Sequence, residues 1–87
     1  MSDRYDMGQL AWQCRRGIKE VEVVLLPYFE QFFSSESEDR QALFVKLLSC
    51  HDPDLFEWFT YRSKPDDAEL AEIVAHVLQR LATRSRT

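Results

Sequence analysis

The chain has 87 residues, a mass of 10.3 kDa and a formal net charge of −4. This length allows one hydrophobic core, so we expect a single domain over 1–87, with a helical bundle at about 6–83 and a flexible tail at 84–87. The acidic balance argues against nucleic-acid binding, which depends on Lys and Arg neutralising phosphates. No apolar stretch approaches the ~20 residues of a membrane helix, so we expect no membrane partner.

Cysteine usage and the N-terminal sequence indicate the compartment. Cys14 and Cys50 can form at most one disulfide, and the first residues lack the basic start and apolar stretch of a secretory signal. We therefore expect a cytoplasmic protein with reduced thiols. Charge is uneven: residues 21–39 hold five acids and no base, whereas Arg15, Arg16 and Lys19 form a small basic cluster. This pattern favours a protein partner over a polyanion.

The first expected helix covers 7–15. Asp6 is positioned to cap it, with Gln9 in the reciprocal capping position. Gly17 follows two arginines, which is the order typical of a helix that ends in cations with a left-handed glycine just beyond it.

The second expected helix runs from 18 or 19 to 33. Its residues 20–26 also alternate like a strand, but no other segment of the chain offers that strand a partner, so we favour the helix. Pro27 deletes the hydrogen bond to the carbonyl of Val23. We therefore expect a kink or a fresh helical start at that residue.

Three further helices follow the polar stretch 34–39. Ser35 with Glu38 makes a capping box, although Ser37 is an alternative cap, and the third helix ends at about residue 50. Asp52 as the cap, followed by Pro53, starts a short fourth helix that ends before residue 62. A fifth begins at residue 66 or 67 and continues to about 83. The sequence thus predicts an all-α bundle of about five helices.

Few residues are arranged for catalysis. The His and Cys residues show no paired metal-ligand spacing, so we expect no metal site. Cys14 beside two arginines could be a nucleophile, but its place on an apolar stripe favours a buried structural role. There is no glycine-rich phosphate loop, and most aromatic residues fall on helical stripes, where they are expected to form the core. An enzyme is the poorer class.

The segment Arg16-Gly17-Ile18-Lys19-Glu20 remains. A helical pair of Arg16 and Glu20 would be weak in this orientation. The better interpretation places Arg16 at the end of one helix, Glu20 in the first turn of the next, and Gly17 at the turn between them. A glycine there also allows another protein's backbone to approach closely.

Three sequence blocks carry a family resemblance: WQCRRGIKE at 12–20, PYFE at 27–30 and LLSCHDPDLFEW at 47–58. In order and spacing they resemble the small succinate dehydrogenase assembly factors with an RGxxE motif, which promote covalent flavinylation. The resemblance implies a five-helix bundle without catalytic activity that binds the flavoprotein subunit of succinate dehydrogenase, and in bacteria often that of fumarate reductase. It also implies that FAD then links to a histidine of that subunit.

We therefore predict a non-enzymatic assembly chaperone of the bacterial type that binds no FAD tightly and is a monomer or weak dimer. Its predicted partner-binding residues are Arg16, Gly17 and Glu20, with Arg15 and Trp12 as neighbours. The first alternative is a carrier that binds FAD itself, which the missing phosphate loop disfavours. The second is a protein-neutralising antitoxin, a label once given to related proteins.

Overall fold

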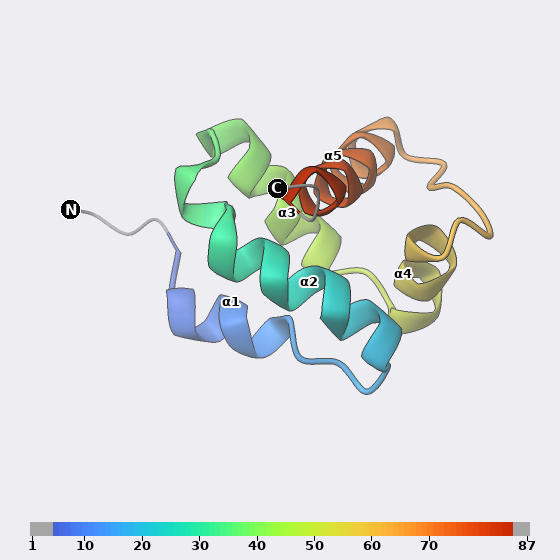
Figure 1. Cartoon of the computed structure of the whole chain (residues 1–87), viewed down its shortest axis with the longest axis horizontal. Helices are drawn as coiled ribbons and strands as arrows, with labels where there is room; N and C mark the ends of the chain where they lie inside the picture. The colour runs from blue at the N-terminus through green and yellow to red at the C-terminus, as the bar shows by residue number, and fades with distance from the viewer. Residues whose placement is uncertain (1–4, 85–87) are drawn as a thin grey trace.

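The computed structural model describes residues 5–84, which form five α-helices and one short 3₁₀ helix with no strand in that range (Figure 1). The all-α prediction is confirmed, and residues 20–26 are helical. Arg84, the first residue of the expected tail 84–87, is the last residue of α5, and the rest of that tail lies outside the described residues. The elements are α1 (Met7–Gln13), α2 (Lys19–Gln31), η1 (Phe33–Ser35), α3 (Glu38–Leu48), α4 (Asp52–Phe59) and α5 (Ala68–Arg84).

Helix α2 crosses the centre of the molecule (Figure 1). It packs against η1, α4 and α5, and α5 also packs against α3 and α4. The core contains a cluster of aromatic rings whose centroids lie 5.1–6.4 Å apart: Tyr28, Phe29, Phe33 and Phe44. The expected packing role of most aromatic residues is thus confirmed. Trp12 and Tyr61 are the exceptions, because they are 72% and 80% exposed.

The caps of α1 and α3 are local. The Asp6 carboxylate accepts a hydrogen bond from the backbone N–H of Gln9 at 3.1 Å, as predicted. The predicted capping box of Ser35 and Glu38 does not form. Ser37 caps α3 by accepting from the N–H of Arg40 at 3.2 Å, while the Ser35 hydroxyl donates to the carbonyl of Phe32. The sequence had left Ser37 open as the alternative.

The course of the chain at Pro27 and the start of α4 also differ from the prediction. Helix α2 continues through Pro27, so the fresh helical start is wrong. Because Val23 is 54% exposed, water can solvate the carbonyl that Pro27 leaves without a donor. Helix α4 begins at Asp52 itself, with His51 as the capping residue and no side-chain cap bond. The Asp52 carboxylate is instead engaged in a tertiary contact.

A buried carboxylate joins the segment before α3 to α2 and α5. Glu36, whose side chain is 5% exposed, accepts a hydrogen bond from the Tyr28 hydroxyl at 2.7 Å through Oε2. His76 Nε2 lies 2.7 Å from the same oxygen, and Arg80 Nε lies 3.4 Å away. Burial alone would raise the pKa of Glu36, but these three hydrogen bonds outweigh it and hold the pKa below its ordinary value of 4.5.

Acid should therefore weaken the fold through Glu36. Because its pKa is lower in the folded state, the carboxylate stabilises the fold fully above pH 4.5, and this contribution is lost as the pH falls through the lowered pKa. We expect Glu36→Gln to cost about 1–3 kcal/mol at pH 7, and the difference from the wild type to shrink in acid. Thermal melts from pH 7 to pH 3 measure this. The control is Glu72→Gln, at an exposed acid on α5. If Glu36→Gln lost the same free energy of unfolding at all pH values, the lowered pKa of Glu36 would be contradicted.

Candidate functional site

The arginine of the RGxxE motif is turned into the protein. Arg16 lies in the link between α1 and α2, and its side chain is only 16% exposed. Its Nη1 donates to Asp52 Oδ1 at 3.1 Å, and its Nη2 donates to the backbone carbonyl of Leu48. Arg16, which we predicted to contact a partner, therefore directs its charge into the protein. Its ion pair is with Asp52, 36 residues away, and not with Glu20.

The position of these two acceptors explains why a guanidinium fits there. Leu48 is the last residue of α3, so its carbonyl has no partner within the helix and lies at the helix's negative end. Asp52 is the first residue of α4, where an acid is favoured. A guanidinium offers several donors in a fixed plane and can reach both at once. Through these contacts Arg16 holds the α1–α2 link against the junction between α3 and α4.

The exposed residues of the motif are Gly17 and Glu20. Helix α1 ends at Gln13, two residues earlier than predicted, so Gly17 is not the residue just past the helix. Its φ is not positive, which corrects the expected left-handed conformation. A Cβ atom added at Gly17 would meet no atom within 4 Å. This glycine is therefore not required by the fold.

Glu20 lies in the first turn of α2 and is exposed. Among residues 5–84 no hydrogen bond or ion pair of its carboxylate is described, so it is available to a partner. Trp12 at the end of α1 and Arg15 in the link are also exposed. We call these four residues the turn surface: Trp12, Arg15, Gly17 and Glu20. An indole, a cation, an open backbone and a carboxylate together offer stacking and charge-assisted contacts to another protein.

Cys14, the residue considered as a nucleophile, is structural. Cys14 is fully buried, and burial raises the pKa of its thiol to about 12 despite the nearby Arg16. The thiol is therefore protonated at neutral pH, which confirms the structural role expected for it.

Within residues 5–84 no cluster of three or more His, Cys, Asp or Glu could hold a metal ion. In the same range no helix is long and apolar enough to cross a membrane.

Sequence reasoning missed the contact that positions the turn surface. Asp52 was interpreted as a helix cap, and the carbonyl of Leu48 carries no sequence signal at all. Helix α4 begins at Asp52 and not after it, so the Asp52 carboxylate is not used as a cap and pairs with Arg16. The pairing itself joins residues 36 positions apart, which spacing rules for helices do not cover.

On and beside the link between α1 and α2 the chain exposes an indole, a cation, an open glycine backbone and a carboxylate, an arrangement suited to binding another protein. A family model described as flavinator of succinate dehydrogenase matches residues 8–81. The chain is 42% identical over 76 residues to the FAD assembly factor SdhE of Idiomarina loihiensis, which covers 87% of this chain and 84% of the relative. It is 38% identical over 81 residues to that of Pseudomonas aeruginosa, covering 93% and 96%.

The chain therefore belongs to the family of flavinators of succinate dehydrogenase. The match includes all five helices, because residues 8–81 begin in α1 and end in α5. The resemblance inferred from the three sequence blocks is confirmed.

Proposed function

We propose that this protein binds the flavoprotein subunit of succinate dehydrogenase and promotes the covalent attachment of FAD to that subunit. The observation that carries the proposal is family membership over most of the chain. The turn surface supports it, because the motif residues Gly17 and Glu20 are exposed and neither is needed for the fold's own contacts. The fumarate reductase flavoprotein subunit is a second client under the same proposal.

In this proposal the motif has two parts. Gly17 and Glu20, with Trp12 and Arg15 beside them, contact the flavoprotein subunit directly. Arg16 acts through the fold, because its guanidinium is held by Asp52 and the carbonyl of Leu48 and keeps the link in place. Loss of Arg16 would displace the turn surface, whereas loss of Glu20 would remove one contact from an intact surface.

We further propose that the protein has no catalytic activity of its own. The protonated Cys14 thiol supports this, since the most reactive side-chain type near the motif is buried. The protein would hold the flavoprotein subunit in the conformation in which FAD bonds to one of its histidines. It would act in the cytoplasm as a monomer or weak dimer.

The purified chain should bind FAD weakly or not at all. The aromatic rings able to stack on a flavin are mostly packed against one another in the core, and the sequence has no glycine-rich loop for a pyrophosphate. Titration of FAD, followed by flavin fluorescence and calorimetry, measures this. Saturable binding at low micromolar FAD would favour the carrier alternative over the chaperone.

The function is tested in bacterial cells that lack their own assembly factor. Expression of this chain should restore covalent flavin on the succinate dehydrogenase flavoprotein subunit, seen as fluorescence of that band in a denaturing gel. The parallel band of fumarate reductase tests the second client. No gain in fluorescence, with the chain present in the soluble fraction, would reject the proposal.

A further inference from the structure

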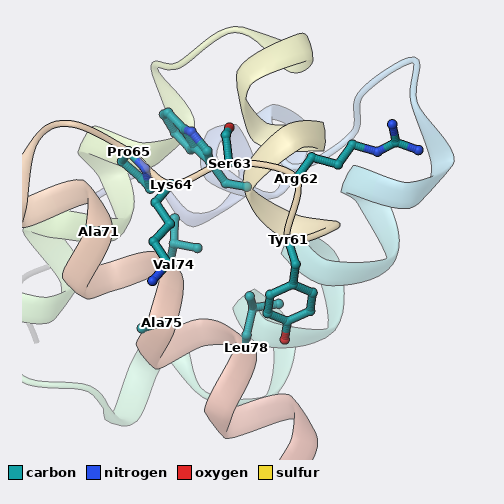
Figure 2. A pocket seen from close by; sticks show the side chains of 10 residues that line it. Tyr61, Arg62, Ser63, Lys64, Pro65, Ala71, Val74, Ala75 and Leu78 are labelled. Carbon is teal, nitrogen blue, oxygen red and sulfur yellow. The ribbon is translucent and has the colours of Figure 1, made fainter.

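A second surface lies away from the motif, between α5 and the loop that follows α4. It contains a pocket of about 440 Å³ (Figure 2). Its apolar floor comes from one face of α5, where Ala71, Val74, Ala75 and Leu78 recur at helical spacing. Trp58 and Pro65 complete the apolar lining.

The hollow has a simple cause in the sequence of α5. The neighbouring stripe of this helix bears Ile73 and Val77, which are fully buried in the core. On the pocket side, Ala71 and Ala75 lie four residues apart and carry only a methyl group each. Two small side chains on adjacent turns leave room between Leu78 and the loop, so an apolar surface stays open to solvent.

The mouth of the pocket holds an exposed aromatic ring, that of Tyr61. Tyr61 has a φ of 63° and is 80% exposed. Tyr61 is the left-handed residue that ends α4: its N–H donates to the carbonyl of Trp58 at 3.3 Å, and the N–H of Arg62 donates to the carbonyl of Glu57 at 2.9 Å. Figure 2 shows the Tyr61 ring beside Leu78 at the edge of the pocket. An exposed ring next to an apolar hollow can close over an inserted side chain.

One cation reaches the pocket. Lys64 lines it and extends over Val74, whereas Arg62 points away from it in Figure 2 and lies over the ring of Phe56, 5.4 Å from its centroid. No ion pair of Lys64 is described within residues 5–84. An unpaired ammonium over an apolar floor favours a ligand with an apolar body and a carboxylate beside it.

We propose that this pocket receives an apolar side chain flanked by an acidic residue of the flavoprotein subunit, and so forms a second contact with the partner that the turn surface binds. The inference rests on the proposed function. In Figure 1 the loop after α4 and the link between α1 and α2 lie toward the same end of the molecule, with α4 between them. A partner that spans α4 would reach both.

Two variants test the pocket by binding to the isolated flavoprotein subunit of succinate dehydrogenase, measured by calorimetry. Ala75→Trp fills the hollow, and Lys64→Glu reverses its charge; both residues are exposed, so the fold should tolerate the changes. We expect each to weaken binding about tenfold. Ala42→Trp, at an exposed alanine of α3, is the matched control and should keep the affinity of the wild type.

The outcomes separate the two proposals. Normal affinity in both pocket variants, with loss of binding in Glu20→Ala, would overturn the pocket proposal and leave the proposed function standing. Absence of binding by the wild-type chain would reject both the pocket proposal and the proposed function. An equal loss in Ala42→Trp would show that the effect is not specific to the pocket. Concentration-dependent dimers of the free chain that Ala75→Trp abolishes would assign the pocket to a second copy and would also overturn the proposal.

Discussion

Arg16→Ala should lower the free energy of unfolding by about 2–4 kcal/mol. The substitution leaves the Leu48 carbonyl and the Asp52 carboxylate without their donor at a site where the arginine side chain is only 16% exposed. It also releases the α1–α2 link from the junction of α3 and α4. Urea denaturation of the purified variant gives the free energy, and covalent flavin on the partner subunit should fall together with it.

The neighbouring arginine is the matched control. Arg15 is exposed, so Arg15→Ala should change stability by no more than about 0.5 kcal/mol. Arg16→Lys keeps the charge but loses the planar fork, and we expect a stability between those of the wild type and Arg16→Ala. If Arg16→Ala unfolds at the same urea concentration as the wild type, the contacts of Arg16 contribute nothing and its role must lie at the partner.

Gly17→Arg should abolish flavinylation while the fold stays intact. Apart from Gly17 and its two chain neighbours, no atom lies within 4 Å of a Cβ atom at this position, and the φ of Gly17 is not positive, so a side chain is tolerated by the protein itself. The new side chain would instead occupy the space that the partner's backbone needs. Melting temperature and covalent flavin in complemented cells measure the two effects separately. The control is Gly8→Arg, at an exposed glycine of α1.

Glu20→Ala should likewise reduce flavinylation while the fold stays intact. Removing one charged partner from a docked interface costs about 2–5 kcal/mol, or roughly thirtyfold and more in affinity. Glu30→Ala, at an exposed acid near the other end of α2, should change neither property. Normal flavinylation by both Gly17→Arg and Glu20→Ala would place the partner-binding surface elsewhere.

Local signals in the sequence predicted the helices because they act within a few residues. The side chain of Asp6 caps α1 three residues away, and that of Asp67 accepts from the N–H of Glu69 at 2.7 Å at the start of α5. The same local rules failed at Gly17, because α1 ends before Cys14 and the chain then crosses the surface without a left-handed residue. Cys14, the C-cap of α1, is fully buried, and such tertiary packing lies outside local rules.

The polar network of the core was beyond local rules. Glu36 belongs to the polar stretch 34–39, to which the sequence analysis assigned no tertiary contact, yet its partners Tyr28, His76 and Arg80 are 8, 40 and 44 residues away. One hint was present: a tyrosine on a buried helical stripe needs a partner for its hydroxyl. The candidate site also combines features that the sequence predicts with one that depends on tertiary packing. Its motif and its exposed residues follow from the sequence, whereas the inward turn of Arg16 depends on where α4 packs.

Reconstitution from purified components tests the central claim most directly. The flavoprotein subunit of succinate dehydrogenase, prepared without flavin, is incubated with FAD in the presence or absence of this chain, and covalent flavin is read from a denaturing gel. We predict a faster rise and a higher final level of covalent flavin with the wild-type chain, and no gain with Gly17→Arg. Equal levels with and without the wild-type chain would contradict the account.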